Sequence, residues 1–429
     1  MTAPIKIAIA GLGTVGAGTV QVLRKNHALL AARCGRGFEL VAVSARDRAR
    51  DRGISLNDAA WVDDATALAD TDADVVIELI GGSDGPALDL VRNALAKGKA
   101  VVTANKALIA HHGHELATLA ESNGAPLAFE AAVAGGIPIV KALREGLAAN
   151  QITRVYGILN GTCNYMLSDM RDTGRAFDTV LDEAQALGYA EADPSFDVDG
   201  VDAAHKLAIL ASLAFGTRVD FESVHIEGIR AIDPVDIAYA DELGYRIKLL
   251  GIARLTADGL EQRVHPCMVP RAAPIASVEG VLNAVVGEGD FVDTTVYEGR
   301  GAGAGPTASA VIADLVDIAR GSRVPTFSVP VADLRAAAPV PIDRRAGPYY
   351  VRLMVVDRPG VIADIAACLR DHEVSMEALV QRSRSPDEAV PVVMTTHDVV
   401  EESMAAALKQ IGGLGSVVEP PRMIRIESL

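Results

Sequence analysis

The sequence predicts an α/β protein with a doubly wound parallel sheet, an α+β middle region and a C-terminal unit of the order βαββαβ. Three patterns support this prediction. Strand-like and helix-like segments alternate from the N-terminus to about residue 103, which favours a parallel sheet with helices on both faces. Mixed helical and strand-like segments follow from about 138 to 300, and the segments from residue 349 onward have the βαββαβ order.

The first part contains four short apolar segments of strand length, separated by segments with helical periodicity. Strands are expected at Ile5–Ala10, Leu40–Val43, Asp74–Ile80 and Ala100–Thr103, and helices at Val15–Ala32 and Pro86–Lys97. Beyond this part, a strand is expected at Arg154–Leu159 and a helix at Pro306–Arg320.

A glycine-rich turn joins the first predicted strand to the first predicted helix. It reads GLGTVG over residues 11–16. Glycines allow a tight turn and a close approach of the backbone, and the free N–H groups of a helix N-terminus can bind a pyrophosphate. The turn therefore predicts a Rossmann-type dinucleotide site. Its cofactor-binding residues are expected to be Gly11, Gly13, Thr14, Val15 and Gly16.

The residues after the second predicted strand bear on the choice between NAD and NADP. An acidic residue there binds the ribose 2′-hydroxyl, whereas an arginine accommodates a 2′-phosphate. Ser44, Arg46 and Arg48 could all reach a phosphate, which favours NADP. Asp47 lies between the arginines, so use of NAD remains possible, and a solvated loop is the alternative for the arginines.

The Pro- and Arg-rich stretch Pro339–Pro348 is typical of a linker, and a separate unit is expected after it. Strands are expected at Tyr349–Val356, Val374–Gln381, Val390–Thr396 and Met423–Ile426, and helices at Val361–His372 and Glu402–Ile411. This order, with an Asp-Arg-Pro-Gly turn at 357–360, resembles the ACT domain, a ferredoxin-like regulatory module that binds amino acids. A dimerisation module without a ligand is the alternative.

Composition narrows the class of protein. The net charge of −16 argues against nucleic acid or a membrane surface as a partner, since both call for a basic face. Four scattered cysteines fit a reducing compartment and predict no disulfide framework and no zinc site. No apolar run is long enough to span a membrane, and the N-terminus does not resemble a signal peptide. We expect a cytoplasmic protein.

Residues 184–206, AQALGYAEADPSFDVDGVDAAHK, concentrate charged side chains in one stretch of the chain. Pro194 disfavours helix at Asp193, and a new helix is expected from about Asp199. Asp202 and Lys206 are four residues apart and therefore share one helix face. A polar patch on an apolar helix indicates a site for a small zwitterion, with a cation beside it. An exposed salt bridge is the alternative.

A second lysine, Lys106, follows the predicted strand Ala100–Thr103. Ligands of open α/β sheets lie at the carboxyl ends of the strands. Hydride transfer to a carbonyl places negative charge on its oxygen, so Lys106 and Lys206 are the candidate catalytic residues. Two ammonium groups in one pocket should disfavour each other's charge and tune one of them towards proton transfer.

The segment 184–206 resembles the signature of homoserine dehydrogenases. Its matching positions are Ala184, Gly188, Tyr189, Ala190, Asp193, Pro194, Asp197, Val198, Gly200, Asp202 and Lys206. Further resemblances are the segments TANK (103–106), EAAVAGGIP (130–138), NGTCNY (160–165) and GRGAGAG (299–305). The resemblance covers nearly the whole chain and implies reversible, NAD(P)H-dependent reduction of L-aspartate 4-semialdehyde to L-homoserine, in threonine and methionine biosynthesis.

The resemblance also implies roles for single residues. Lys206 matches the catalytic lysine, and Lys106 the lysine beside the nicotinamide and the substrate. The substrate-binding residues are expected to be Glu191 and Asp202, which hold the amino end, together with Gly188 and Asp197. Besides the glycine turn, the cofactor-binding residues are expected to be Arg46, Lys106, Gly188 and Gly303. A monovalent cation, usually sodium, is expected at the backbone carbonyls of Glu130, Val133, Gly135 and Ile137.

The implied domains are 1–137 for the nucleotide, completed by about 305–340, then 138–304 for substrate and oligomerisation, and 349–429 for the ACT-like unit. L-threonine is the expected effector, and a homo-oligomer is expected. One residue departs from the resembled pattern, because Cys163 replaces the second threonine of Asn-Gly-Thr-Thr-Asn-Tyr. This change is expected to be a tolerated substitution of one small residue, and the alternative is a semialdehyde dehydrogenase that uses Cys163 as its nucleophile. A non-enzymatic alternative is an NADPH-dependent amino-acid sensor that uses the ACT-like unit.

Overall fold

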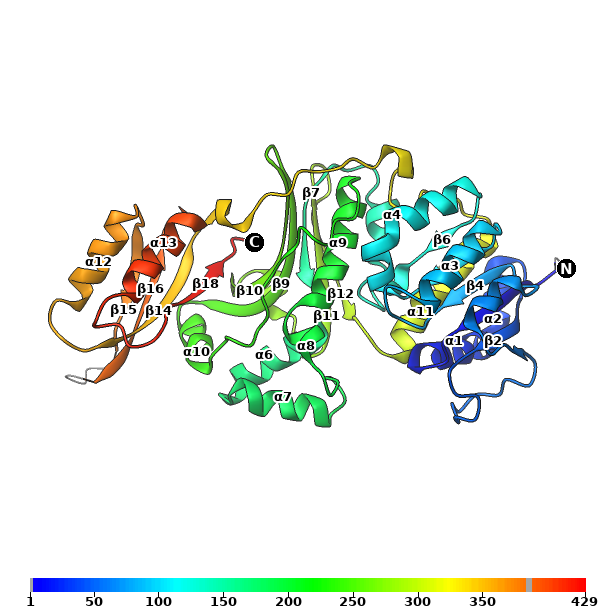
Figure 1. Ribbon diagram of the computed structural model, residues 1–429, viewed down its shortest axis with the longest axis horizontal. Coiled ribbons are helices and arrows are strands. Elements are labelled where there is room, and N and C mark those ends of the chain that lie inside the picture. The colour runs from blue at the N-terminus through cyan, green and yellow to red at the C-terminus, as the bar shows by residue number, and fades with distance from the viewer. Residues whose placement is uncertain (1–2, 383–387) are drawn as a thin grey trace.

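The computed structural model describes residues 3–382 and 388–429. Residues 1–2 and 383–387, which belong to the first and last predicted domains, lie outside the described residues. The molecule is elongated, with the N-terminal unit at one end, the middle region at its centre and the C-terminal unit at the other end (Figure 1).

The N-terminal unit is built on a parallel sheet of six strands in the order β3-β2-β1-β4-β5-β6, which confirms the predicted doubly wound fold. The strands are β1 Ile5–Ala10, β2 Phe38–Ser44, β3 Ala60–Trp61, β4 Val75–Glu78, β5 Ala100–Thr103 and β6 Leu127–Ala128. The edge strands β3 and β6 were not predicted, because two residues are too few to show a periodic pattern.

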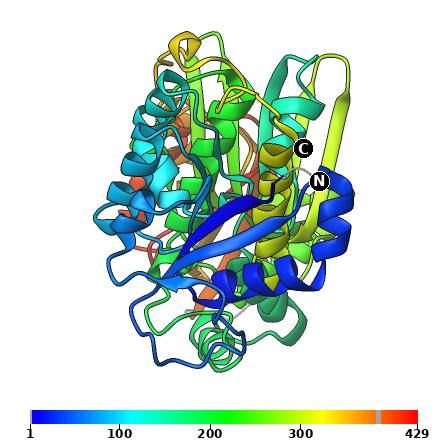
Figure 2. The same ribbon diagram turned by 90° about the vertical axis from the view of Figure 1, so that its right-hand side faces the viewer.

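Helices cover both faces of this sheet, as the end-on view in Figure 2 shows. One face carries α1 Thr14–Lys25, α2 His27–Cys34 and α11 Ala304–Arg320, and the other carries α3 Pro86–Ala96 and α4 Lys106–Ser122. The single helix predicted at Val15–Ala32 is in fact two helices, because the backbone leaves the helical conformation at Asn26. Gly18 of α1 lies so close to α11 that a Cβ on it would be 2.8 Å from the carbonyl oxygen of Ala304.

The middle region packs helices against a mostly antiparallel sheet. Its strands are β7 Ile152–Ile158, β8 His225–Ile226, β9 Tyr245–Thr256, β10 Gly259–Pro270, β11 Leu282–Gly289 and β12 Asp293–Arg300. Its helices are α5 Ile139–Lys141, α6 Gly161–Thr173, α7 Phe177–Ala186, α8 Ser195–Val198, α9 Val201–Phe215 and α10 Pro234–Glu242. The nearly all-buried helix α9 lies between this sheet and α4 of the N-terminal unit (Figure 1).

The C-terminal unit has the predicted βαββαβ order. Its elements are β14 Tyr349–Val356, α12 Val361–Asp371, β15 Met376–Val380, β16 Ala389–Thr396, α13 Glu401–Gly412 and β18 Arg422–Ile426, with a small pair of β13 Ala346–Gly347 and β17 Val399–Val400. This unit is joined to the middle region by a contact that was not predicted. Strand β18 pairs in parallel with β10, so one sheet runs through both regions.

The predicted linker Pro339–Pro348 contains one short helical turn, Ile342–Arg344, and is anchored by tertiary contacts. Arg345 is only 7% exposed. Its Nε donates to Glu427 Oε1 at 3.1 Å, and its Nη2 donates to the carbonyl of Ile426 at 2.8 Å. Composition indicated a linker, but it could not reveal these tertiary contacts.

Short helical turns complete the fold. They are η1 Ala65–Asp70, η2 Glu130–Ala132, η3 Ala142–Gly146, η4 Pro274–Ser277, η5 Val331–Asp333 and η6 Ile342–Arg344. Within residues 3–382 and 388–429, none of the helices has the length and apolar character needed to cross a membrane.

Candidate active site

Two lysines from different units meet on one buried carboxylate. Lys206 Nζ donates to Asp202 Oδ2 at 2.7 Å and to the carbonyl of Leu159 at 2.8 Å. Lys106 Nζ lies 3.0 Å from Asp202 Oδ1. Asp202 and Lys206 lie on α9 of the middle region, and Lys106 is the first residue of α4 in the N-terminal unit. The Asp202–Lys206 pair is therefore not the exposed salt bridge of the alternative interpretation, since the Asp202 side chain is only 5% exposed.

Asn160 joins a second carboxylate to this centre. Its Nδ2 donates to Asp197 Oδ1 at 2.7 Å and to Asp202 Oδ2 at 2.9 Å. Its Oδ1 accepts from the backbone N–H of Cys163 at 2.8 Å, which caps the N-terminus of α6. The Asn160 side chain thus caps a helix and also bridges two carboxylates.

The charges of this cluster depend on one another. Burial opposes ionisation of Asp202, but the ammonium groups of Lys206 and Lys106 outweigh it and lower the Asp202 pKa. Burial also favours the neutral amine of Lys106, yet Asp202 outweighs this and raises the Lys106 pKa. Burial and the charge of Asp202 raise the pKa of Asp197. The expectation that the lysines tune each other by repulsion is wrong for Lys106, because Asp202 lies between the two ammonium groups.

An aromatic cluster borders the lysines and was not predicted. The ring of Phe196 lies 5.3 Å from Lys106 Nζ. His205 is stacked on Phe221 with ring centroids 4.2 Å apart, and its Nε2 lies 3.2 Å from His111 Nε2. Burial first, and the neighbouring His111 second, lower the pKa of His205 to about 4. These side chains come from distant segments, so no spacing in the sequence could have indicated the cluster.

Cys163 cannot act as the nucleophile of a semialdehyde dehydrogenase. Its side chain is fully buried, and its Sγ donates to the carbonyl of Asp197 at 3.3 Å. Burial and the nearby Asp197 raise the pKa of the thiol. A reactive cysteine needs an accessible, stabilised thiolate, so this alternative is wrong.

The other predicted substrate residues lie on the loop between α7 and α8. Glu191 and Gly188 are exposed on it, and the hydroxyl of Thr162 anchors the loop through the carbonyl of Tyr189 at 2.7 Å. Glu191 is near enough to Lys106 to contribute to raising its pKa. The structure therefore places Glu191 beside the lysine cluster and open to solvent.

The predicted cofactor turn has the geometry of a close-approach loop. Gly11 has φ +93°, and a Cβ there would lie 2.4 Å from the carbonyl oxygen of Leu79. A Cβ on Gly16 would lie 2.0 Å from the carbonyl oxygen of Gly11. The N-terminus of α1 begins directly after Gly13, and the first turn of that helix contains no acidic residue. Gly303, with φ +115°, precedes α11, which packs on α1. These features fit a nucleotide pyrophosphate.

The loop after β2 folds back over this turn. Arg46 and Arg48 are exposed, whereas Ser44 is only 2% exposed and is therefore a poor phosphate ligand, contrary to expectation. The carboxylate of Asp47 accepts from the backbone N–H of Ala49 at 2.8 Å. Arg52, which was not predicted, donates from Nε to the carbonyl of Leu12 at 3.1 Å.

The predicted cation loop lies beside a buried acidic pair. The carboxylate of Glu130 accepts from the backbone N–H groups of Val140 and Lys141, both at 2.9 Å. The N–H of Glu130 donates to Asp314 Oδ2 at 2.9 Å. Ala134 and Gly135 both have positive φ. No group of three or more potential His, Cys, Asp or Glu metal ligands occurs in the described part of the chain.

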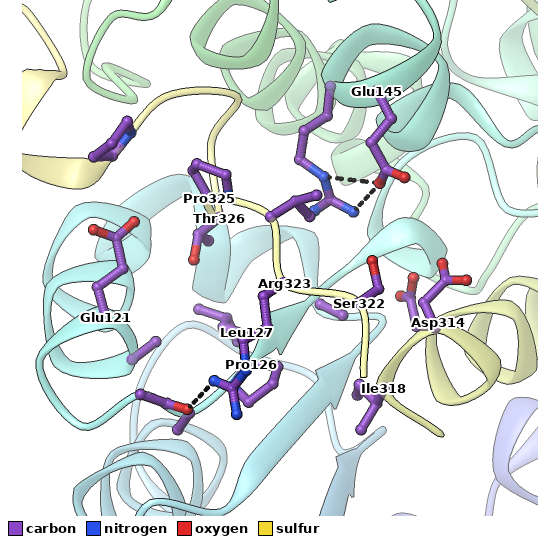
Figure 3. Close-up of a pocket in the computed structure, with 18 residues that line it drawn as sticks. Glu121, Pro126, Leu127, Glu145, Asp314, Ile318, Ser322, Arg323, Pro325 and Thr326 are labelled. Carbon is purple, nitrogen blue, oxygen red and sulfur yellow. Dashed lines mark hydrogen bonds and ion pairs between the residues drawn. The ribbon is translucent and has the colours of Figure 1, made fainter. Parts of the chain in front are cut away.

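A cavity of about 350 Å³ lies near the C-terminal end of α4, roughly 20 Å along that helix from Lys106 (Figure 3). Glu121, Glu145, Asp314, Arg323 and Thr326 contribute polar groups to it. Its lining includes none of the residues predicted to bind substrate or cofactor.

Comparisons with known proteins match nearly the whole chain. Sequence profiles described as homoserine dehydrogenase, as the NAD-binding domain of homoserine dehydrogenase and as the ACT domain match residues 138–316, 11–130 and 349–415. A curated homoserine dehydrogenase of Neisseria gonorrhoeae is 48% identical over 432 residues, covering 99% of both chains. One of Pseudomonas aeruginosa is 48% identical over 435 residues, again covering 99% of both.

Solved structures agree with these matches. A homoserine dehydrogenase structure from Thiobacillus denitrificans superposes with a TM-score of 0.94 at 47% identity, covering 99% of this chain and 98% of that one. The matches to the NAD-binding domain of homoserine dehydrogenase and to the curated enzymes define an NAD(P)-dependent oxidoreductase that acts on a CH–OH group. The chain belongs to the homoserine dehydrogenase family, with a C-terminal ACT domain. It is an enzyme, so the sensor alternative is wrong.

Proposed function

We propose that Lys206 and Lys106 carry the reversible reduction of L-aspartate 4-semialdehyde to L-homoserine at the contact between α9 and α4. The observation that supports this most directly is their convergence on Asp202, at 2.7 Å and 3.0 Å. The site lies where the carboxyl end of a parallel strand meets the middle region, the usual position of ligands in open α/β sheets.

In this proposal the reduced nicotinamide cofactor, when bound, supplies a hydride to the aldehyde carbon. An ammonium group has three donors, and Asp202 and the carbonyl of Leu159 take two of those of Lys206. The third is left for the reacting oxygen, to which Lys206 gives a proton or a stabilising charge. Lys106, fixed by Asp202 and facing the ring of Phe196, holds a second positive charge beside the substrate.

We assign the amino end of the substrate to Glu191 and Asp202, with Gly188 and Asp197 completing the substrate site. Glu191 is the more accessible of the carboxylates. Both oxygens of Asp202 already contact lysines, so its first task is to orient them. Substitution of Glu191 by Gln should therefore raise KM for the semialdehyde while the cofactor affinity stays unchanged.

We propose NADP as the preferred cofactor, bound by residues 11–16 together with Arg46, Lys106, Gly188 and Gly303. Arg46 and Arg48 are accessible after β2, and Asp47 uses its carboxylate within its own loop, which disfavours the NAD-type contact. We also propose that the nucleotide domain comprises 1–137 and about 305–340, with 138–304 as substrate and oligomerisation domain and 349–429 as the regulatory domain.

We propose a sodium ion at the backbone carbonyls of Glu130, Val133, Gly135 and Ile137. The Glu130 carboxylate accepts from two amides, and backbone carbonyl oxygens are ligands that suit a hard cation. A higher thermal midpoint in sodium chloride than in choline chloride of equal ionic strength would support the site.

We further propose a cytoplasmic homo-oligomer, assembled through the middle region and regulated by L-threonine at the ACT domain. NADPH oxidation with L-aspartate 4-semialdehyde tests the reaction, and repeating it with NADH tests the cofactor preference. Titration with L-threonine up to millimolar concentrations tests the effector. No change of rate would leave the ACT domain as an association module.

A further inference from the structure

We infer that the ion pair between Arg425 and Glu227 positions helix α8, which carries Asp197 of the proposed substrate site, and that it is the contact through which the ACT domain acts on the active site. Arg425 and Glu227 are thus positioning residues for the reaction. The inference rests on the proposed function, because it takes Asp197 and Asp202 as part of the substrate site.

Arg425 ties the ACT domain to the middle region through one guanidinium group. It lies on β18, the strand that pairs with both β10 and β14. Its Nε donates to Glu401 Oε2 at 2.8 Å, and its Nη1 and Nη2 donate to the two oxygens of Glu227, both at 2.8 Å. Arg425 and Glu401 are 4% and 8% exposed. Such paired contacts fix orientation as well as distance.

Each carboxylate belongs to a different unit. Glu401 is the first residue of the ACT helix α13. Glu227 directly follows β8 in the middle region, and its N–H donates to the carbonyl of Val264 on β10 at 2.7 Å. His225 Nε2 lies 2.7 Å from Glu227 Oε1 and holds that carboxylate from the other side. A shift of α13 relative to β18 would therefore act on the position of Glu227.

The three residues that follow Glu227 contact helix α8 and the residue directly after it. A Cβ on Gly228 would lie 2.2 Å from the carbonyl oxygen of Val198, so the two backbones are in contact there. The N–H of Ile229 donates to the same carbonyl at 2.9 Å. Arg230 Nε donates to Asp199 Oδ1 at 2.5 Å.

Helix α8 carries two groups of the proposed site. Asp197 accepts from Asn160 at 2.7 Å, and the ring of Phe196 faces Lys106. Contacts between 228–230 and α8 are made largely by backbone, and close-packed interiors transmit displacement because they contain few voids. A displacement of Arg425 can therefore be transmitted to Asp197 through one ion pair and one backbone contact. A ligand that moves Arg425 when it binds to the ACT domain would act on Asp197 through the same contacts.

The test compares Glu227→Gln with wild type and with a matched control, Glu261→Gln. Glu261 is a partly buried carboxylate of the same sheet that pairs with Arg263, at 2.8 Å, and not with the 227–230 segment. For Glu227→Gln we expect KM for L-aspartate 4-semialdehyde to rise roughly 3- to 30-fold, the range for mutations that alter coupling between sites. Glu261→Gln should leave KM within about twofold.

Cofactor affinity is the second measurement. Trp61, the only tryptophan of the chain, lies 5.7 Å from the guanidinium groups of Arg48 and Arg52, so its fluorescence should report NADPH binding. That affinity should be unchanged in Glu227→Gln. Arg425→Lys keeps the charge but loses the forked geometry and should raise KM similarly. The double variant should raise KM no more than Arg425→Lys alone, since the contact with Glu227 is already altered in that variant.

The outcomes separate the inference from the proposed function. An unchanged substrate KM in Glu227→Gln, with normal wild-type turnover, overturns the inference alone. An equal rise of KM in Glu261→Gln, or an equal loss of NADPH affinity in Glu227→Gln, also overturns it, because the pair would then serve only general stability. Absence of wild-type turnover with the semialdehyde would instead overturn the proposed function.

Discussion

Asp202 shows how one residue can set the chemistry of a site without reacting itself. Its two oxygens hold two ammonium groups that come from helices of different units. A buried carboxylate is costly unless it is paired, so the lysines and Asp202 need each other in this position.

Lys206→Ala should lower kcat by roughly 10²–10⁴, the usual contribution of a positioned acid or base. NADPH binding, followed through Trp61, should be nearly unchanged because the glycine turn is elsewhere. Lys97→Ala is the control, since Lys97 forms an exposed pair with Asp70. A normal kcat in purified Lys206→Ala would remove this lysine from the mechanism and leave Lys106 as the candidate.

Cys163→Ser should keep kcat within roughly threefold of wild type, because a hydroxyl can donate the same hydrogen bond to the carbonyl of Asp197. Steady-state kinetics of the variant check this, and alkylation of the native enzyme should leave Cys163 unmodified by peptide mass analysis. A phosphate-dependent activity that disappears in the serine variant would contradict the burial argument.

At the scale of elements, α4 and α9 bring the two lysines together, and in our proposal the β2–β3 loop sets the cofactor preference. Lys106 starts α4 shortly after strand β5, and Lys206 lies in the first half of α9. The loop after β2 returns to the glycine turn through Arg52, which donates to the carbonyl of Leu12. A phosphate on the ribose would therefore meet several guanidinium groups.

Arg46→Ala combined with Arg48→Ala should raise KM for NADPH much more than KM for NADH. Loss of charge-assisted contacts to a 2′-phosphate should cost about 1.5–3 kcal/mol. Arg33→Ala, an exposed arginine on α2, is the control. Equal changes for both cofactors would show that the arginines form only a solvated loop.

At the scale of the whole molecule, the ACT domain and the middle region share one sheet and a buried set of charges. Glu427 contacts Arg263 and Arg345, and all three are less than 10% exposed. Burial opposes ionisation of Glu427, but the two guanidinium groups outweigh it and lower its pKa to about 2. The joint between the regions thus depends on a charged carboxylate.

Acid should weaken this joint. A carboxyl group with a lowered pKa in the folded state stabilises that state above its unfolded value of 4.5 and loses the contribution as pH falls towards about 2. For Glu427 this amounts to on the order of 3 kcal/mol. Urea unfolding from pH 6 to pH 3 should show a shallower pH dependence for Glu427→Gln than for wild type. Parallel curves would contradict the assignment.

Removal of the ACT domain should lower the stability of the remaining chain. A chain that ends near Arg345 loses β18 and leaves the edge of β10 and the side chain of Arg263 without their partners. We expect a lower thermal midpoint and no response to L-threonine, while the lysine cluster is kept. Thermal unfolding and kinetics of the truncated chain check this, and an unchanged midpoint would mean that the shared sheet contributes little.

The sequence by itself determined the fold class, the strand–turn–helix of the glycine loop and the order of the ACT elements. These features are local. The hydrophobic period of a strand or helix is visible in a few consecutive residues, and the glycines at 11 and 16 indicate a turn in which a Cβ would not fit. The long signature at 184–206 indicated Asp202 and Lys206 in the same way, because four residues make one helical turn.

Only the tertiary structure decided how these parts meet. The placement of Asp202 between two lysines, the burial of Cys163 and the pairing of β18 with β10 each join segments far apart in the chain. Two-residue strands such as β3 are too short to show an alternation of apolar and polar residues. No pattern in the sequence around Asn160 or Phe196 indicates which side chains they contact. Burial, charge pairing and sheet register depend on which surfaces pack against each other in the folded protein. The spacing of residues along the sequence does not show which surfaces these are.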